Sequence, residues 1–448
     1  MRASRAWRAL PFVLLGLSPT PARCQDSQYW TLQYGPVAEL LGGVVVGSSR
    51  DLSASYYNPG ALALAKDPSL LASVESFQAT SVTAEAVPPL LDFHDLDIRP
   101  APSLFAVALP RSFTGSHTWV FSSLTRQDFD IRLDNWLVAE QAGAEALLDQ
   151  SLTESWFGLS WAHAAGESVG LGLTTYVAYR GQRTRLELSG EAARSPGTGG
   201  AVLLVEDYDY GDYRALWKAG IAVKRHTWDL GLSVTTPSVG LFGSGTASYI
   251  RSAVGGDLGS GTAEATVAVR HEEDLASKYQ SPWSVAGGAA WRRGDSTFHA
   301  TAEWFGAVQA FDVLDAATFS GDPAASRLLG RLRQEARSVV NVGFGFQRNV
   351  SERFSYYGAF TTDRTFANKS ARAANSLSTW DIYHATAGTS LQVRDVKFTL
   401  GVAYAFGGDD RPTSVIVVPP DGRPALGETP VHVNFSRWKV LIGFDFGG

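Results

Sequence analysis

The sequence predicts an all-β protein: a transmembrane antiparallel β-barrel of about 14 strands with a small N-terminal plug, or hatch, inside the lumen. Three observations lead to this prediction. Apolar and polar residues alternate along many short segments, the connections between these segments are alternately short and long, and the segment near the N-terminus follows neither pattern. The composition agrees, because 45% of the 448 residues are hydrophobic while the mean hydropathy is only -0.05. Apolar side chains are therefore plentiful but interleaved with polar ones.

The alternation is clearest in the C-terminal half. One face of the segment 397–406 carries Phe398, Leu400, Val402, Tyr404 and Phe406. Small or polar residues occupy the other face, which suits a wet lumen behind a lipid-facing wall. The strands of a soluble β-sandwich also alternate and are the alternative. They rarely place aromatic residues at both ends of such long segments, as the interfacial girdles of a membrane barrel do.

Charge and cysteine content exclude several partners. The net charge of -6 and the pI near 5.8 provide no basic surface for the phosphates of a nucleic acid. Outside the N-terminus the sequence has no run of about 18 apolar residues, which disfavours membrane-spanning helices. The single cysteine, Cys24, falls within the predicted signal peptide, so we expect neither a disulfide nor a cysteine-based metal site in the mature chain.

The first residues are typical of a secretory signal peptide. Arg2, Arg5 and Arg8 form its cationic part, the apolar core follows at 9–17, and Ala22-Arg23-Cys24 resembles a cleavage site. A lipoprotein anchored through Cys24 is the alternative, although an arginine is a poor neighbour for lipid attachment. We therefore predict a signal peptide at 1–24, a plug at 25–66 and the barrel at 67–448.

The predicted plug is small, apolar and rich in turns. Its plug or gating motif comprises Asp51, Tyr56, Tyr57, Asn58, Pro59 and Gly60. Proline fixes its own φ and pushes Asn58 into an extended conformation, and the asparagine side chain can cap nearby backbone. The sequence alone leaves open whether this turn is a fixed anchor or a moving gate, and whether the two tyrosines line a ligand path or pack the lumen.

Connection lengths predict the number of strands. Short turns fall near 111–116, 164–167, 224–226, 294–295, 349–352 and 394. Long connections fall at about 83–101, 129–152, 184–209, 239–282, 309–335, 366–379 and 408–431. Six short turns and seven long connections give about 14 strands with both ends of the chain on one side, provided that 262–269 lies outside the wall. The segments 137–148 and 324–336 are rich enough in Ala, Leu and charge for short helices at the outer mouth.

The last strand and the plug carry the resemblance to a known family. The C-terminal segment 435–446 places Trp438, Val440, Ile442, Phe444 and Phe446 on one face, like the closing strand of outer-membrane proteins. The segment 51–63, with its aspartate followed by Asn-Pro, resembles the hatch of the FadL family of long-chain fatty-acid transporters. The segments 282–291, 301–304, 337–363 and 380–406 resemble strands of the same family. Gly60 stands where the family usually has alanine, and the family's charged ligand-binding residues have no assigned counterparts here.

The resemblance implies a function and a location, which we state as expectations. A FadL-like protein of the bacterial outer membrane would take up hydrophobic small molecules passively, either long-chain fatty acids or aromatic hydrocarbons. The plug would shift, and the ligand would leave sideways through the wall. Candidate residues for a ligand groove in the outer loops are Leu90, Leu91, Phe93, Leu241 and Phe242, since exposed apolar patches usually mark binding sites. These side chains can equally pack the loops together.

Enzymatic and metal-dependent functions have little support in the sequence. No His-Glu-x-x-His, Walker loop or nucleophile elbow is present, and glycines such as Gly170 and Gly172 suit crowded lumen positions. His299 and Glu303 share one face of a strand and are expected to be wet lumen residues. We expect no cofactor and no metal, and the partners expected are a hydrophobic ligand, membrane lipid and lipopolysaccharide around a monomer. The rival functions are a protein-binding platform of a secretion system and an outer-membrane lipid hydrolase, which requires a serine, a histidine and an acid or carboxamide on one barrel face.

Overall fold

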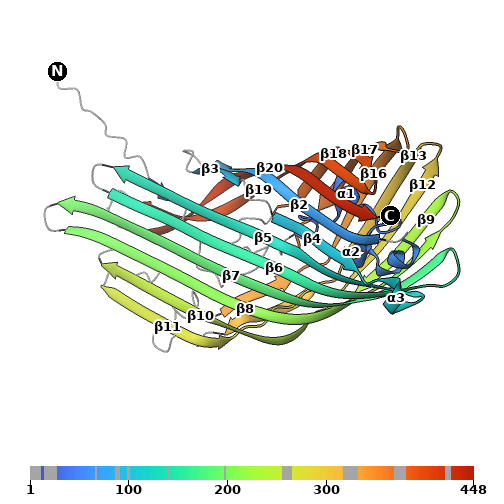
Figure 1. Cartoon of the computed structure of the whole chain (residues 1–448). Helices are drawn as coiled ribbons and strands as arrows, with labels where there is room; N and C mark the ends of the chain where they lie inside the picture. Colours follow the sequence, from blue (N-terminus) through green and yellow to red (C-terminus); the bar gives the residue numbers. More distant parts are fainter. Residues whose placement is uncertain are drawn as a thin grey trace, which may run out of the picture.

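The structure is a computed structural model that describes a barrel and the segment inside it (Figure 1). The described residues are 12–14, 28–65, 68–85, 91–97, 101–139, 142–195, 198–254, 265–315, 331–367, 380–418 and 425–447. Leu90 therefore lies outside the described residues, as does most of the predicted signal peptide. Within that peptide, the short strand β1 (Phe12–Leu14) pairs with 416–418.

Fourteen strands close into an antiparallel ring, which confirms the predicted fold class and strand number. The ring is closed by pairing between the first and last of these strands, in which Val74 lies opposite Ile442. Its members in chain order are β2 (Pro68–Glu85), β4 (Ala101–Ala108), β5 (His117–Ala139), β6 (Ala142–Ala164), β7 (Val169–Ser195), β8 (Thr198–Lys224), β9 (Trp228–Thr235), β12 (Ser284–Arg293), β13 (Ser296–Phe305), β16 (Val339–Asn349), β17 (Phe354–Asp363), β18 (Ile382–Val393), β19 (Val396–Val418) and β20 (Ala425–Gly447).

Tight turns join the strands at one end of the ring, at the positions that the sequence predicts. The first of them contains the single helical turn α3 (Arg111–Thr114). Three of the others need a left-handed backbone, with φ of 78° at Gly166, 58° at Gly294 and 53° at Arg394. The C-terminus lies at this end as well (Figure 1). Within the described residues, no helix is long and apolar enough to cross a membrane.

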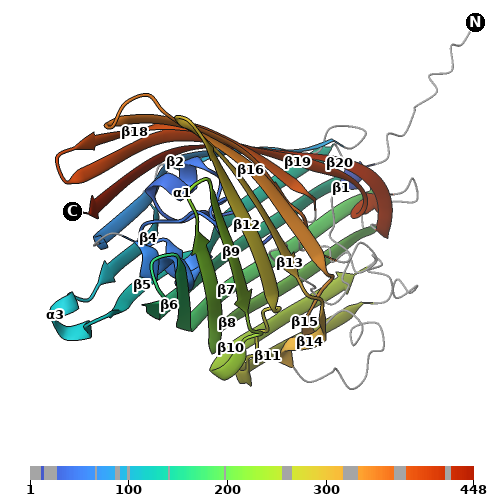
Figure 2. The same ribbon diagram turned by 90° about the vertical axis from the view of Figure 1, so that its right-hand side faces the viewer.

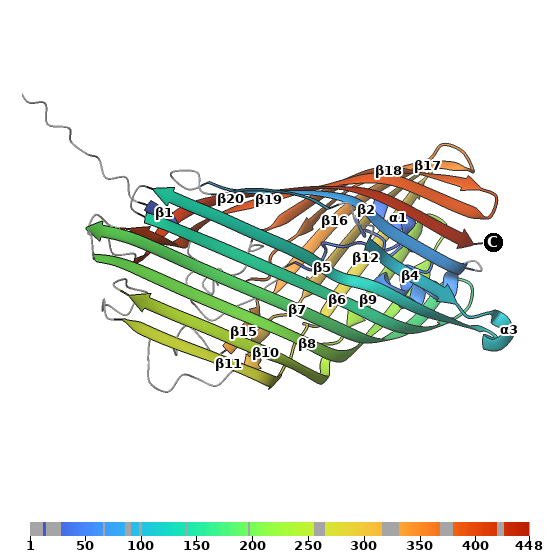
Figure 3. The same ribbon diagram turned by 60° about the vertical axis from the view of Figure 1, so that its left-hand side comes forward.

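The other end of the ring differs from the sequence prediction, because strands continue through segments predicted as loops. β7 and β8 have 27 residues each, whereas crossing a bilayer takes roughly 9 to 11. Figure 3 shows β5 to β8 running far beyond the tight-turn half of the molecule. The long connections predicted at 129–152 and 184–209 are therefore largely strand. The helix predicted at 137–148 is wrong, since β5 and β6 pair throughout this hairpin and cross-strand bonds satisfy the backbone that a helix would satisfy locally.

Short strands extend the wall or cover the outer end. β3 (Leu91–Asp97) pairs with β2, β10 (Val239–Val254) continues β9 along the outer half of β8, and β11 (Thr266–Ala276) pairs with β10. β11 is not one of the fourteen ring strands, but residues 266–269 form a strand paired with β10 where the sequence analysis expects a loop outside the wall. β14 (Val308–Asp315) and β15 (Arg331–Ala336) form a separate hairpin. Residues 331–336 of the second predicted helix are thus strand, and 324–330 lie outside the described residues.

The outside of the ring is apolar, as the alternating pattern predicts. Phe398, Leu400 and Val402 are 41%, 59% and 48% exposed, while their neighbours Thr399 and Ala403 are buried. The predicted closing strand follows the same rule, with Trp438 exposed and Leu441 buried. An apolar exterior on this scale is energetically favourable only against lipid or another apolar surface.

The segment before β2 lies inside the ring near the tight-turn end, where the strands surround it (Figure 2). It contains α1 (Pro36–Leu40), α2 (Ala54–Tyr57) and the 3-10 helix η1 (Pro59–Leu64). Apolar side chains on both sides join it to the wall in one buried cluster that includes Leu40, Leu52, Tyr176 and Leu216. We call residues 28–65 the plug segment.

Candidate functional site

Asn58 fixes the plug segment to the wall. Its Nδ2 donates to the carbonyl oxygens of Val46 at 3.0 Å and Ile221 at 2.9 Å, and its Oδ1 accepts from the N–H of Gly60 at 3.2 Å. The side chain is fully buried, and the backbone is extended with φ of -159°. One amide thus joins two parts of the plug segment to β8.

Glycines make room for this contact. A Cβ at Gly60 would lie 2.7 Å from the carbonyl oxygens of Gly170 and Gly220, and a Cβ at Gly172 would lie 2.3 Å from the carbonyl carbon of Pro59. Backbone therefore packs directly on backbone, closer than any side chain permits. This confirms that Gly170 and Gly172 occupy crowded lumen positions.

Asp51 has a local role. Its carboxylate accepts from the N–H of Ser53 at 2.9 Å and from the Ser53 hydroxyl, which shapes the turn before α2. A separate ion pair reaches the wall nearby, where an Nη2 of Arg50 lies 2.6 Å from an oxygen of Asp229 on β9. Within the predicted motif, Asp51 shapes this turn while Asn58 contacts the wall.

The two tyrosines of the motif differ. The Tyr57 hydroxyl donates to Oε1 of Gln33 and accepts from the N–H of Tyr34, both at 2.9 Å, so this ring packs within the plug segment. Tyr56 is only partly buried and packs edge-on to Tyr57, with ring centroids 5.1 Å apart. Burial raises the pKa of Tyr56 to about 12, so its hydroxyl stays neutral near pH 7. Tyr56 faces a cavity.

This cavity lies between the plug segment and the outer part of the lumen. The cavity is partly open to solvent. Its lining combines aromatic side chains from the plug segment and the wall with a few charged ones. The residues include Tyr29, Tyr56, Trp156, Tyr279, Phe305, Arg126, Lys218, Glu154 and Glu303. Apolar walls with a few fixed polar groups are typical of a small-molecule site.

Two buried cations in the lining bind the plug backbone. An Nη2 of Arg126 donates to the carbonyl of Tyr29 at 2.6 Å, and Nζ of Lys218 donates to the carbonyl of Tyr56 at 2.7 Å. Neither cation forms an ion pair with any residue that the structure describes, and Nη1 of Arg126 is buried without a hydrogen-bond partner. The cavity lining therefore carries two cations without a direct ion pair beside the carboxylates of Glu154 and Glu303, an arrangement that sequence reasoning did not identify.

Glu303 and His299 also bind the plug segment. Glu303 accepts from Nε1 of Trp30 and from the Ser284 hydroxyl, both at 2.8 Å, while Nδ1 of His299 lies 2.8 Å from Oγ of Ser48. The sequence predicted wet lumen residues at these positions. The structure instead uses both as contacts between the wall and the plug segment.

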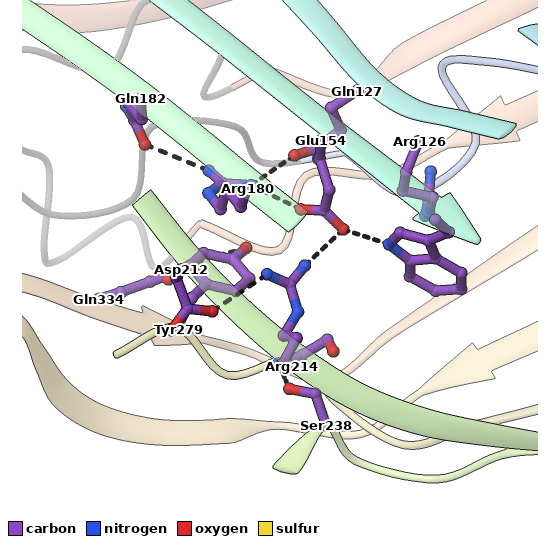
Figure 4. Close-up of polar contacts among 12 residues, drawn as sticks. Arg126, Gln127, Glu154, Arg180, Gln182, Asp212, Arg214, Ser238, Tyr279 and Gln334 are labelled. Atoms are coloured by element: carbon purple, nitrogen blue, oxygen red, sulfur yellow. Dashed lines mark hydrogen bonds and ion pairs between the residues drawn. The ribbon is translucent and has the colours of Figure 1, made fainter. Parts of the chain in front are cut away.

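A polar cluster borders the cavity and shares Glu154 and Tyr279 with its lining (Figure 4). Glu154 on β6 pairs with Arg180 on β7 at 3.0 Å and with Arg214 on β8 at 2.5 Å. The ring of Tyr279 lies 4.0 Å and 4.6 Å from these two guanidinium groups, and its hydroxyl accepts from Nε2 of Gln334 on β15 at 3.0 Å. The connection between β11 and β12 is thus tied across the lumen to the wall.

The wall is incompletely paired beside Arg126. β4 pairs with β5 only between 104–108 and 120–124, and from Thr125 onwards β5 has no strand on that side within the described residues. Arg126 lies at the bulge where the pairing of β5 with β6 shifts register. Arg126, a charged residue of the cavity lining, therefore lies where β5 extends beyond its pairing with β4.

The predicted groove residues that the structure describes lie in strands β3 and β10 and are not part of the cavity lining. Leu91 and Phe93 are in β3, opposite Ala84 and Val82. Leu241 and Phe242 are on β10, 53% and 67% exposed, and the Phe242 ring stacks on exposed Tyr213 with centroids 4.7 Å apart. The structure thus places Phe242 on the outside of the wall, and these candidates do not converge with the plug motif.

Comparison with known proteins identifies the fold. No family model and no curated protein matches the chain. Among solved structures, a FadL homologue of Pseudomonas aeruginosa is similar over 94% of this chain and 100% of its own, with 12% identity and a TM-score of 0.62. The fold is that of FadL. The Pseudomonas putida toluene transporter TodX has the same FadL-type fold, at 11% identity, a TM-score of 0.59 and coverage of 96% and 100%. So does the monoaromatic hydrocarbon channel CymD, at 12% identity, a TM-score of 0.54 and coverage of 93% and 98%.

Proposed function

We propose that this protein is a bacterial outer-membrane channel for passive uptake of hydrophobic small molecules. The apolar exterior of a closed β-barrel supports the location, because bacterial outer membranes hold such barrels. The ring is complete within one chain, so we propose a monomer surrounded by membrane lipid and lipopolysaccharide. The solved structures that share the FadL-type fold include proteins described as a toluene transporter and a hydrocarbon channel.

The aromatic cavity with two cations that form no direct ion pair with any described residue carries the proposal. Trp156, Tyr279 and Phe305 offer apolar contact, and Arg126 and Lys218 offer charge-assisted hydrogen bonds to an anion. Together they suit an amphipathic acid better than a neutral hydrocarbon. We therefore place long-chain fatty acids first among the ligands and aromatic hydrocarbons second.

The same cations connect ligand binding to the plug segment. Both donate to plug carbonyls, and a ligand carboxylate is a stronger acceptor than a neutral carbonyl. A carboxylate that binds Arg126 and Lys218 would therefore release two of the contacts that hold the plug segment in place. We propose that the plug then shifts and that the ligand leaves through the open edge of β5.

Binding and transport by defined variants test this function. We would measure binding of radiolabelled dodecanoate and of toluene to the purified protein, and uptake of both by proteoliposomes. The double variant Arg126→Ala, Lys218→Met should lose about tenfold or more of its dodecanoate affinity, since removing a charged hydrogen bond costs about 1.5–3 kcal/mol. Its toluene affinity should change much less.

A matched control keeps the test specific. Arg185→Ala removes a cation from the exposed outer wall, where its side chain is 43% exposed, and should leave both ligands unaffected. Wild-type protein that binds neither ligand and leaves proteoliposome uptake at the background of empty vesicles would refute the proposed function. Equal losses for dodecanoate and toluene would refute the assignment of the cations to a carboxylate.

A further inference from the structure

A serine, a histidine and a glutamate form a hydrogen-bonded chain on the outside of the outer wall, away from the cavity. Ser248 on β10 lies directly opposite His271 on β11, and Ser248 Oγ is 2.7 Å from Nδ1 of His271. Nε2 of the same ring is 2.9 Å from Oε1 of Glu273. The chain therefore runs from hydroxyl to imidazole to carboxylate.

We propose that Ser248, His271 and Glu273 form a hydrolase site for carboxylic esters with an apolar acyl group. A carboxylate can only accept, so Glu273 fixes the proton of His271 on Nε2. Nδ1 then carries the lone pair and can take the proton of the Ser248 hydroxyl. This is the arrangement of nucleophile, base and orienting acid that acyl transfer requires, and it is recognised by geometry and not by order in the sequence.

The surroundings of the chain suit an acyl substrate. Ile250 and Val269 form the next outward-facing pair along the same two strands, and Val267 follows. Val267 and Val269 are 72% and 63% exposed, so they form an uncovered apolar strip that begins beside the Ser248–His271 pair. An acyl chain laid on this strip would bring its carbonyl carbon towards Ser248 Oγ.

The backbone at the site is distorted. The register between β10 and β11 shifts here, so that Thr246 faces both Glu273 and Asp274. Asp274 adopts φ of 54°, one of only two non-glycine residues with positive φ among those the structure describes. Bulges and left-handed residues are often found beside active sites, where they re-aim a side chain. Here the bulge directly follows Glu273, the orienting acid.

The position of the site indicates whether its substrate comes from the bilayer or from the surrounding medium. Ser248 lies six residues beyond Phe242 along β10, or about 20 Å at ~3.3 Å per residue. Phe242 and Tyr213 belong to the aromatic edge of the apolar exterior. The site is therefore well outside the apolar belt and would act on esters presented from the surrounding medium, not on acyl chains within the bilayer.

The proposed reaction has two steps. Ser248 Oγ attacks the ester carbonyl carbon while His271 Nδ1 takes the hydroxyl proton, and the leaving alcohol receives that proton as its C–O bond breaks. Water then attacks the acyl-Ser248 ester and gives its proton to His271, which returns it to Ser248 as the carboxylic acid leaves.

Hydrolysis of p-nitrophenyl butyrate and octanoate by the purified full-length protein tests the site, together with labelling by a fluorophosphonate probe. Ser248→Ala should abolish labelling. His271→Ala should lower kcat/KM by about 10²-fold or more, the usual contribution of a general base. Glu273→Gln should cause a smaller loss and change the pH profile of kcat/KM, which a purely structural carboxylate would not.

Ser252→Ala is the matched control, because Ser252 is on the same strand and face but lies opposite Val267 and not a histidine. It should keep full activity and labelling. Absence of ester hydrolysis in the wild-type protein, or activity that survives Ser248→Ala, would overturn the proposal. Uptake of free dodecanoate should be unchanged in Ser248→Ala, so failure of this site and failure of the channel function give different results.

Discussion

The side-chain amide of Asn58 donates to the backbone carbonyl of Ile221 on β8, over 2.9 Å. A second bond from the same amide reaches Val46 within the plug segment. Asn58 thus joins two parts of the plug segment to β8 through one side chain.

Asn58→Ala should loosen the plug segment without unfolding the ring. Two buried carbonyls would lose a donor, at a cost of about 1–3 kcal/mol for an unsatisfied buried group. We expect larger or more frequent open events in planar-bilayer conductance. Asn349→Ala, at the exposed end of β16, should behave like the wild type. Unchanged conductance in Asn58→Ala would show that the remaining contacts between the plug segment and the wall hold the plug without this side chain.

Gly60→Ala should disturb the same junction by crowding. The new Cβ would lie 2.7 Å from two carbonyl oxygens, and overpacking of this kind costs about 1–3 kcal/mol. Faster hydrogen exchange across 54–65 should report the loss. Gly287→Ala is the control, since no atom lies within 4 Å of its added Cβ. Equal exchange in the two variants would contradict this account of the contact.

Glu154→Gln should destabilise the polar cluster that borders the cavity. Arg180 and Arg214 would remain buried without their shared carboxylate, and breaking a buried ion pair costs about 3–5 kcal/mol. The urea midpoint of unfolding in detergent should fall. Glu187→Gln removes a partly exposed partner of Arg185 and should cost about 0–1 kcal/mol. A midpoint that falls no further than in Glu187→Gln would mean that the arginines find other partners.

Linking the plug to the wall should block transport but not binding. Ser48 and His299 are in contact, and the sole cysteine of the chain lies in the predicted signal peptide. The double variant Ser48→Cys, His299→Cys, joined by a short thiol crosslinker, should bind dodecanoate normally and lose proteoliposome uptake. The unlinked double variant is the control. Full uptake after complete crosslinking would show that this part of the plug does not move.

The fold could be predicted from the sequence because it depends on local patterns. Alternation at residues such as Leu400 and Val402 follows from a wall with lipid on one side, and short turns such as the one at Arg394 mark where strands reverse. The prediction failed at 137–148. The outer half of β5 and β6 lies beyond the apolar exterior, so its composition carries no lipid-facing signal and Ala and Leu there also suit a helix.

The candidate site could be predicted only in part. Asn58 and Gly60 were identified because the sequence Asn-Pro-Gly predicts a turn from residues that are adjacent in the chain. The roles of Arg126 and Lys218 depend on the carbonyls of Tyr29 and Tyr56, which are far away in the chain. Ser248 and His271 are 23 residues apart in a segment predicted as loop, and only the register of β10 with β11 brings them together.

The 27-residue length of β7 and β8 has a consequence for how a solute would reach the cavity. At ~3.3 Å per residue each strand extends for about 90 Å, and only part of that length can lie within a bilayer. In the outer membrane that we propose for this protein, the remainder of each strand would project into the lipopolysaccharide layer. A hydrophobic molecule would then pass from the medium to the cavity without contact with the surrounding polysaccharide.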